Sequence, residues 1–314
     1  MLDLTAPKRT SSFEADILFG LSQPQKSIPC QYFYDAAGSR LFEQITELEE
    51  YYPTRTEIAI LRACAPQLAA ETKDGTVLVE FGSGSSLKTE ILLSACPAIR
   101  RYVPIDVSHT MLQSAKSRLE AKFSHLAVEP VFGDFAGSVL LPAAVQAAPV
   151  LGFFPGSTIG NFSREAAVRL LAGLRGMLGA GSRLILGADL RKPADILIPA
   201  YNDATGVTAA FNLNLLVRIN RELGGSFDLG KFRHQATYDV VAGRIDMWLV
   251  STEGQAVSVA GRHFRFRAGE RIHTEISQKY HVEDLQEMAR AAGWCIRAVW
   301  TDPRQLFSVH EFLS

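Results

Sequence analysis

Two glycines that follow an apolar segment could let a nucleotide-like ligand approach bare backbone. Residues 76–81 read Thr-Val-Leu-Val-Glu-Phe, the nearly continuous apolar pattern of a strand covered on both faces, and Gly82 and Gly84 follow at once. A helix is predicted over 89–95, and the N–H groups at a helix start point outward. The arrangement favours a ligand-binding turn, although an ordinary Gly-Ser loop stays open as an alternative for these residues taken alone.

Two later apolar segments end in acids that could accept hydrogen bonds from the same ligand. Residues 101–106 form a predicted strand that ends at Asp106, about one βαβ unit after the glycine turn. In such folds a carboxylate at this place binds the two hydroxyls of a ribose. Residues 131–135 end a third predicted strand at Asp134 and Phe135. Acid-bearing strand ends in this order are much harder to obtain by chance than a single one.

The elements that must position these residues alternate between helix and strand from about residue 60 to 190. Repeated βα units predict an α/β fold with a doubly wound parallel sheet, whose ligand lies beyond the carboxyl ends of the strands. A closing antiparallel hairpin is predicted at the C-terminus. The remaining predicted elements are helices over 13–21, 108–123, 164–178, 195–205, 207–223 and 282–292, and strands from 150 and over 183–188, 236–241, 244–251, 256–266, 295–301 and 307–312.

The βα rhythm breaks after Asp189, which predicts an inserted α+β unit. We therefore expect a sheet domain made of residues 60–190 and 281–314. The N-terminal residues 1–59 and residues 191–280 are expected to form a second domain that binds substrate. At 314 residues the chain is long enough for both.

The N-terminal part of the second domain is dense in aromatic residues. Asp35 can cap a helix there, and Pro53 is placed to begin the next one. A core-forming aromatic cluster is the favoured interpretation for any one of these tyrosines. The aromatic residues are Tyr32, Phe33, Tyr34, Phe42, Tyr51 and Tyr52.

The amino-acid composition of the chain limits the kinds of partner that it can be expected to bind. The chain is 47% hydrophobic and 21% charged, and its 32 Lys and Arg against 33 Asp and Glu give a net charge of −1. Nucleic acid is therefore not an expected partner, whereas a small substrate is. No apolar segment is long enough to cross a membrane, and the N-terminus lacks the apolar centre of a signal peptide. We expect a cytoplasmic protein.

Cysteine and histidine spacing does not indicate a metal site. The four cysteines, Cys30, Cys64, Cys96 and Cys295, are scattered without a C-x-x-C pair, so buried free thiols are expected in place of a zinc site or a disulfide scaffold. The histidines likewise show no ligand spacing, and we expect none of them to be catalytic.

The glycine turn resembles the first motif of class I S-adenosylmethionine (SAM) methyltransferases. That motif has the form E/D-x-G-x-G, here Glu80-Phe-Gly-Ser-Gly84. The turn departs from the dinucleotide pattern G-x-G-x-x-G, because Leu87 stands at the third glycine position. A closing antiparallel hairpin is also typical of the methyltransferase sheet.

Nearly the whole chain resembles the histidine-specific SAM-dependent methyltransferases of the ergothioneine pathway, which convert L-histidine to its α-N-trimethyl betaine, hercynine. The motifs outside the cofactor fold are the ones that separate this family from other SAM enzymes. The motifs are Tyr32-Phe-Tyr-Asp, Glu50-Tyr-Tyr-Pro-Thr-Arg55, Glu80-Phe-Gly-Ser-Gly84, Gly156-Ser-Thr-Ile-Gly-Asn161, Tyr201-Asn-Asp-Ala-Thr-Gly-Val-Thr208 and His273-Thr-Glu-Ile-Ser277.

On the cofactor side, the resemblance implies that Gly82 and Lys88 contact the methionine part of SAM and that Gly84 also binds the cofactor. It implies that Asp106 binds the ribose. Asp134 and Phe135 would hold the adenine, with the carboxylate accepting from the exocyclic amine.

On the substrate side, the resemblance implies substrate-binding roles for eight residues, of which Tyr51 and Asn161 would also be catalytic. Asn161 would bind the amino acid backbone, Tyr51 the α-amino nitrogen and Tyr201 the carboxylate. Glu275 and Ser277 would bind the imidazole, Met247 would line that pocket, and Gly156 and Thr208 would contribute to the site. Taken singly, a loop Asn or Ser is more often a turn former and a strand Met more often core.

Two other functions stay open at this point. An α-N-methyltransferase for another amino acid or related amine would differ only near Met247, Glu275 and Ser277. A SAM-binding protein without catalysis is the second, although it would have no need of Tyr51, Asn161 and Tyr201. No obligatory protein partner is expected, and a monomer would be sufficient.

Overall fold

The computed structural model describes residues 13–84, 86–137 and 139–314, and its larger sheet has eight strands within them. The order is β12-β13-β6-β5-β1-β2-β3, with β4 also paired to β2. β12 and β13 run antiparallel, as the predicted hairpin requires, and the pairs among β1, β2, β5 and β6 are parallel. The strands are β1 (Thr76–Phe81), β2 (Ile99–Asp106), β3 (Ala127–Val128), β4 (Val131–Phe132), β5 (Val150–Phe154), β6 (Arg183–Asp189), β12 (Cys295–Thr301) and β13 (Phe307–Leu313).

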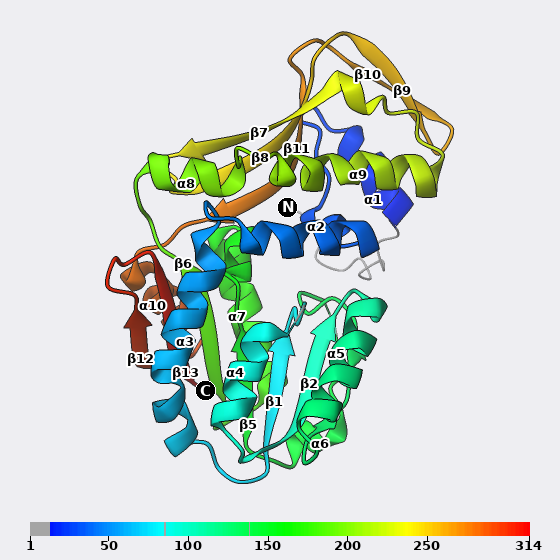
Figure 1. Cartoon of the computed structure of the whole chain (residues 1–314). Helices are drawn as coiled ribbons and strands as arrows, with labels where there is room; N and C mark the ends of the chain where they lie inside the picture. Colours follow the sequence, from blue (N-terminus) through cyan, green and yellow to red (C-terminus); the bar gives the residue numbers. More distant parts are fainter. Residues whose placement is uncertain (1–12, 85, 138) are drawn as a thin grey trace, which may run out of the picture.

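Helices cover both faces of this sheet, which confirms the doubly wound fold (Figure 1). Leu78 of β1 packs in a cluster with α3 and α4, whereas its neighbours Val77 and Val79 pack with α7 and α10 on the other face. This alternation is the reason why the strand is apolar throughout. The helices are α3 (Tyr52–Ala70), α4 (Leu87–Ala95), α5 (His109–Lys122), α6 (Ala143–Gln146), α7 (Arg164–Leu178) and α10 (Val282–Ala291).

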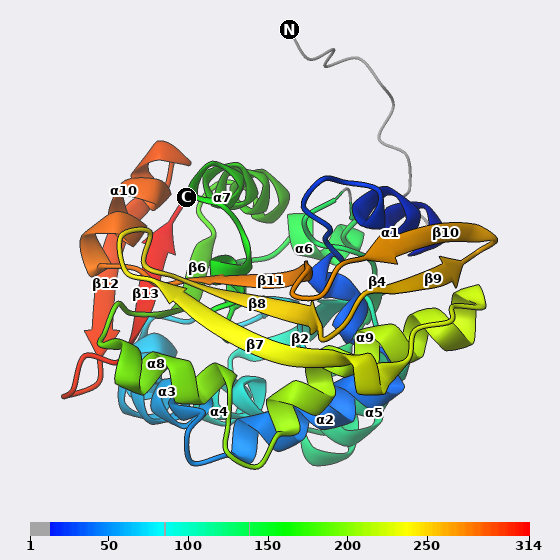
Figure 2. The same ribbon diagram turned by 90° about the horizontal axis from the view of Figure 1, so that it is seen from above.

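The remaining segments build a second layer beyond the carboxyl ends of the parallel strands (Figures 1 and 2). Three antiparallel strands pair in the order β11-β8-β7, and a hydrophobic cluster joins them to two N-terminal helices and to the two helices that precede β7. The elements are α1 (Phe13–Leu21), α2 (Ala36–Glu47), α8 (Ala194–Tyr201), α9 (Val207–Leu223), β7 (Phe232–Asp239), β8 (Arg244–Ser251), β9 (Gln255–Val259), β10 (Arg262–Phe266) and β11 (Arg271–Gln278), with 3-10 turns at Cys30–Phe33, Thr158–Asn161 and Leu229–Lys231.

Several details differ from the prediction. Residues 256–266 form a hairpin, β9 and β10, and not one strand, because Ala260 and Gly261 both adopt positive φ and reverse the chain. β4 stops at Phe132, so Asp134 lies in the loop beyond the strand. The strand β11 was not predicted, and the helix predicted over 195–205 ends at Tyr201. The proposed domain boundary at residue 60 lies inside the continuous helix α3.

Local chemistry explains how the N-terminal helices begin. The Asp35 side chain accepts a hydrogen bond from the Gly38 N–H at 2.7 Å, and Pro53 stands in the first turn of α3.

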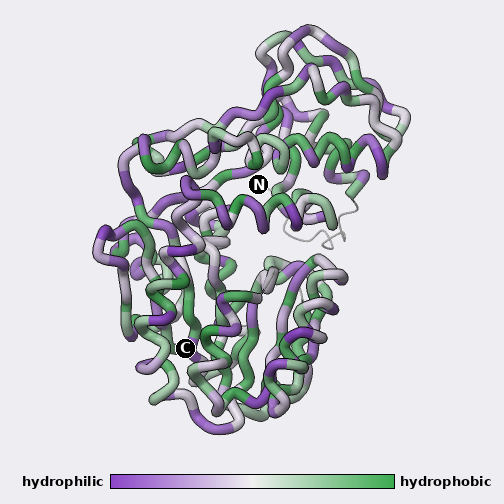
Figure 3. The backbone as a smooth tube through the Cα atoms, viewed as in Figure 1, coloured by the Kyte–Doolittle hydropathy of each residue, from purple (hydrophilic) through white to green (hydrophobic). Residues whose placement is uncertain are grey.

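Apolar residues concentrate along the central strands and the inner helix faces (Figure 3). No helix in the described ranges is both long and apolar enough to cross a bilayer.

The expected burial of the cysteines holds for only two of them. Cys64 and Cys96 are buried in the core beneath α3 and α4, but Cys30 is half-buried and Cys295 is exposed. Cys295 begins β12, an edge strand whose alternate residues face solvent.

Candidate active site

A single pocket between the large sheet and the second layer is lined by all fourteen residues that the sequence marked. Six come from the ends of β1, β2 and β4 or from the start of α4, and two follow β5. Of the remaining six, one precedes α3 and five come from the second layer. The fourteen are Gly82, Gly84, Lys88, Asp106, Asp134 and Phe135, with Tyr51, Gly156, Asn161, Tyr201, Thr208, Met247, Glu275 and Ser277. Their convergence joins residues up to 226 positions apart, from Tyr51 to Ser277 (277 − 51).

The glycine turn and Asp106 are held together by backbone hydrogen bonds. The Gly84 N–H donates to Oδ2 of Asp106 at 3.1 Å, and the Ser108 N–H donates to Oδ1 at 2.9 Å. Gly82 and Gly84 both have positive φ, and a Cβ on Gly82 would lie 3.4 Å from the Phe135 ring. Burial raises the pKa of Asp106. The turn therefore keeps open backbone beside a fixed carboxylate, which suits a ribose next to a nucleotide base.

Glu80 lines the pocket, and one of its carboxylate oxygens is held by two side-chain hydrogen bonds. Thr89 donates to Oε2 of Glu80 at 2.5 Å, and the Tyr102 hydroxyl donates to the same oxygen. Burial raises the pKa of Glu80 to about 8. The acid of the first motif thus ties β1 to α4 and β2.

A buried carboxylate that the sequence reasoning missed, Glu57, holds two residues that line the pocket, Lys88 and Gly156. It pairs with the Lys88 ammonium at 2.5 Å and accepts the Gly156 N–H at 3.0 Å with both oxygens. A Cβ on Gly187 would lie 1.9 Å from Oε1 of Glu57, so only glycine leaves room there. Lys88 lines the pocket with its ammonium held by Glu57. The signal in the sequence was an acid inside the apolar face of α3.

At the other end, Glu275 presents a carboxylate to the pocket. It lies on β11 opposite Met247 of β8, and in the described part of the chain its carboxylate has no hydrogen-bond partner. Burial raises the pKa of Glu275 to about 7, although Lys279 opposes the shift. An acid placed in this way can accept a hydrogen bond from a ligand N–H.

Ser277 and Tyr201 touch each other, which the sequence did not predict. Their hydroxyl oxygens are 2.8 Å apart, and Tyr51 packs edge-on to the Tyr201 ring with centroids 6.3 Å apart. Asn161 ends the 3-10 turn that follows β5 and lies on the same pocket wall as Gly156. Thr208 lines the pocket from the first turn of α9.

Part of the N-terminal aromatic cluster lines the pocket and part fills the core. Phe33 is buried and stacks on Phe211 with ring centroids 4.4 Å apart, as the core interpretation expects. Tyr34 and Phe42 pack edge-on with ring centroids 5.6 Å apart, and both line the pocket along with Tyr51. Aromatic rings around a pocket can stabilise a cation.

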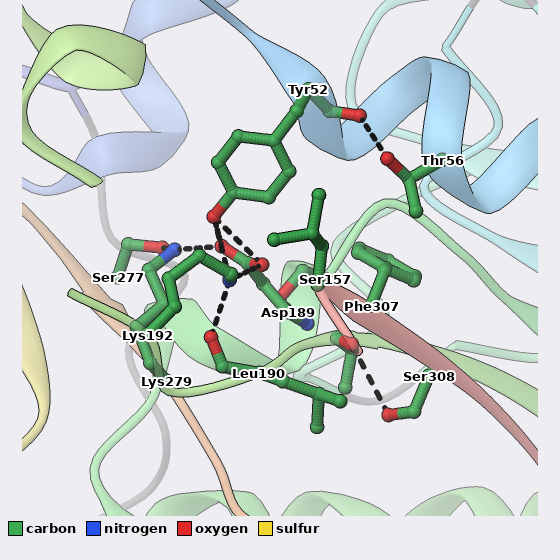
Figure 4. A network of polar contacts seen from close by, with 12 residues as sticks. Tyr52, Thr56, Ser157, Asp189, Leu190, Lys192, Ser277, Lys279, Phe307 and Ser308 are labelled. Atoms are coloured by element: carbon green, nitrogen blue, oxygen red, sulfur yellow. Dashed lines mark hydrogen bonds and ion pairs between the residues drawn. The ribbon is translucent and has the colours of Figure 1, made fainter. Parts of the chain in front are cut away.

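Beneath Tyr201 and Ser277, two lysines and a tyrosine converge on the buried carboxylate of Asp189 (Figure 4). The ammonium of Lys279 lies 2.7 Å from Asp189 Oδ2, that of Lys192 lies 2.6 Å from Oδ1, and the Tyr52 hydroxyl donates at 2.8 Å. Burial alone would raise the pKa of Asp189, but the two ammonium groups hold it below its usual value. The sequence reasoning missed this cluster, although positions 275, 277 and 279 share one strand face by their spacing.

Nearly the whole chain matches a known protein family. Residues 13–313 match the model of a family described as histidine-specific, SAM-dependent methyltransferases. The histidine N-alpha-methyltransferase of Mycolicibacterium smegmatis is 41% identical over 96% of this chain and 94% of its own length. The ergothioneine biosynthesis protein 1 of Neurospora crassa is 29% identical over 92% of this chain, which corresponds to 33% of that larger protein.

Solved structures support the fold. A SAM-dependent methyltransferase from Clostridium acetobutylicum aligns with a TM-score of 0.51 at 11% identity, covering 87% of this chain and 98% of that one. No group of three or more His, Cys, Asp or Glu residues within the described ranges is arranged to hold a metal ion.

Proposed function

Since the chain belongs to the family of histidine-specific, SAM-dependent methyltransferases, we propose that its pocket brings the α-amino nitrogen of L-histidine to the methyl group of SAM. The observation that carries the proposal is the distribution of groups in the pocket. The glycine turn and Asp106 lie at one end, and the unpartnered Glu275 lies with Ser277 at the other. One pocket thus offers a nucleoside site and a site for a ring with an N–H donor.

The residues at the cofactor end fit SAM. Gly82 and Gly84 leave backbone uncovered, Asp106 offers carboxylate lone pairs for ribose hydroxyls, and Phe135 offers an apolar face for the base. Asp134 would accept from the exocyclic amine. The cofactor supplies an electrophilic methyl group on a sulfonium.

The protein contributes orientation and exclusion of water in place of a covalent nucleophile. Tyr51 and Asn161 are proposed to hold the amine so that its lone pair faces the methyl group, and Tyr201 to bind the carboxylate. Holding two reactants in line can lower a barrier by about 7–11 kcal/mol relative to free solution. The aromatic wall of Tyr34, Phe42 and Tyr51 suits an amine that becomes a fixed cation.

Three successive transfers to the same nitrogen would give the trimethyl betaine, hercynine. The ammonium must lose a proton before each transfer, and the third transfer leaves no proton to lose. The walls near Tyr51 and Asn161 must accommodate this growth, while Glu275, Ser277 and Met247 hold the ring.

The broader setting of the enzyme is also proposed. We place it in the cytoplasm, acting on a free amino acid without an obligatory protein partner. Fractionation of cells that produce the protein tests the location, and light scattering coupled to size-exclusion chromatography tests the oligomeric state.

The function is tested by incubating the purified protein with SAM and an equimolar mixture of the common amino acids. Mass spectrometry should show one, two and three added methyl groups on histidine and on no other amino acid. Methylation of a different amino acid with histidine untouched would contradict the substrate assignment. Binding of SAM without any methylation would contradict catalysis.

A further inference from the structure

Lys279 is the one residue that joins the Asp189 cluster to the hydroxyls of the substrate end among the described residues. Its ammonium lies 2.7 Å from Asp189 Oδ2 and donates to the Tyr201 hydroxyl at 2.6 Å and to Ser277 Oγ at 2.8 Å. An ammonium has three N–H donors and no lone pair. The three acceptors therefore satisfy Lys279 completely, and the side chain is fully buried.

This arrangement constrains the two hydroxyl groups. Because Lys279 can only donate, it occupies a lone pair on both Tyr201 and Ser277, and neither hydroxyl proton can point toward it. The two oxygens are 2.8 Å apart, so one hydroxyl donates to the other. The second proton has no partner within the pair and must point elsewhere, and both residues line the pocket.

We propose that Lys279 is a positioning residue for the amino acid, which acts by orienting the Tyr201 and Ser277 hydroxyls so that the pair offers an O–H donor to the substrate. The inference rests on the proposed function for the identity of that substrate. The donor would meet an acceptor on the amino acid, either its carboxylate or an unprotonated ring nitrogen. Asp189 fixes the ammonium from the opposite side.

The location of the cluster supports this role over a purely structural one. Asp189 ends β6 and is already neutralised by Lys192, whose ammonium also contacts the Tyr52 hydroxyl at 2.7 Å. Charge balance at Asp189 does not require a second lysine. Lys279 differs from Lys192 in its contacts with two pocket-lining hydroxyls. Each ammonium also lies 4.5 Å from a tyrosine ring centroid, that of Tyr201 for Lys279 and that of Tyr52 for Lys192.

The test compares two lysine variants. Lys279→Met removes the ammonium beside the hydroxyls, and Lys192→Met is the matched control that removes the other ammonium from the same carboxylate. Calorimetry measures the Kd of L-histidine with S-adenosylhomocysteine bound. We expect Lys279→Met to raise this Kd at least 10-fold and Lys192→Met to raise it less than threefold, with the Kd of S-adenosylhomocysteine within twofold of wild type in both. Equal losses would overturn the proposal, because they would assign Lys279 to charge balance alone.

A double-mutant cycle tests whether Lys279 acts through the hydroxyls. Ser277→Ala should weaken histidine binding at least 10-fold in the wild type and less than threefold in Lys279→Met. If Ser277→Ala weakened histidine binding by the same factor in the wild type and in Lys279→Met, the two residues would act independently, and the proposal would be contradicted. Should Lys279→Met fail to fold by circular dichroism, Lys279→Gln replaces it, since an amide has two donors for three acceptors. A histidine Kd within twofold of wild type in Lys279→Gln would then reject the role.

Failure of the proposed function gives a different result. If the wild type methylates a different amino acid, that amino acid replaces histidine in the same cycle, and the role of Lys279 is still decided. If the wild type methylates histidine but the two lysine variants behave alike, only the role of Lys279 is lost.

Discussion

At the residue scale, Glu275 is the group on which substrate choice depends most. Its carboxylate faces the pocket without a partner in the described residues, while Ser277 two positions later faces the same space. A single Glu or Ser in a sequence does not indicate a binding role. The role of these two is inferred from the pocket that they share with Asp106 and the glycine turn.

Replacing Glu275 with Ala should reduce activity on histidine selectively. A hydrogen bond between a charged acceptor and a buried donor is worth about 1.5–3 kcal/mol, or roughly one to two decades in kcat/KM. The affinity for SAM should stay near that of the wild type. Competition assays with pairs of amino acids measure this selectivity. An equal loss for every amino acid would mean that Glu275 supports the fold, and unchanged histidine activity would place selection elsewhere.

The acidity of Glu275 predicts a pH dependence. Burial raises its pKa to about 7, and an N–H donor on the ligand favours the ionised form. Below pH 7 a proton must therefore leave before histidine binds, so affinity should fall by up to about tenfold per pH unit as pH decreases. The free ligand also titrates in this range, so Glu275→Gln serves as the reference. The wild-type to Glu275→Gln ratio of histidine affinities should shrink below pH 7, and a constant ratio would speak against the role.

At the element scale, sequence patterns predicted those elements whose burial is regular. The predicted bounds of β1 and α7 are the bounds in the structure, because a strand covered on both faces and an amphipathic helix have distinct hydrophobic periodicities. β11 was missed because the strand carries Glu275 and Ser277 toward the pocket and lacks a clean apolar face. The Asp189 and Glu57 clusters were missed because charges are buried only where tertiary contacts pair them.

An element-scale prediction concerns His310 in the interior of the large sheet. It lies on β13 between β6 and β12, and burial lowers its pKa to about 4. The unfolded chain binds a proton near pH 6.5 and the folded chain does not, so stability is lost as pH falls from about 6.5 to 4. At about 1.4 kcal/mol per pH unit, the full loss is on the order of 3 kcal/mol.

Denaturant unfolding at several pH values measures this effect in His310→Gln. The variant should lose less stability than the wild type between pH 6.5 and 4.5. His263→Gln is the matched control, because His263 is exposed on β10 and its replacement should leave the slope of the wild type unchanged. Parallel slopes for all three proteins would show that His310 does not control acid stability.

At the scale of the whole molecule, the pocket depends on two layers meeting. Glu275, Ser277 and Tyr201 come from the second layer, whereas Asp106 and Asn161 follow strands of the large sheet. The resemblance of the motifs to a known family indicated that residues of both layers share one site. The periodicity of the sequence predicts single helices and strands and cannot show which of them share a pocket. The ion pair between Lys279, which follows β11, and Asp189, which ends β6, links the layers directly.

Ligands should accordingly slow hydrogen exchange in both layers. Adding S-adenosylhomocysteine with L-histidine should protect the glycine turn after β1 and also β11 and the start of α9. Hydrogen exchange read by mass spectrometry measures this segment by segment. Protection restricted to the large sheet when both ligands are present would argue against a shared cleft.

The most direct test of the account locates the transferred methyl groups. The protein is incubated with L-histidine and SAM that carries a deuterated methyl group, and the products are fragmented in a tandem mass spectrometer. The geometry predicts up to three labelled methyl groups, all on the α-nitrogen, with an unlabelled imidazole ring. Label on a ring nitrogen would mean that Glu275 and Ser277 do not hold the ring away from the methyl donor, and would contradict the central claim.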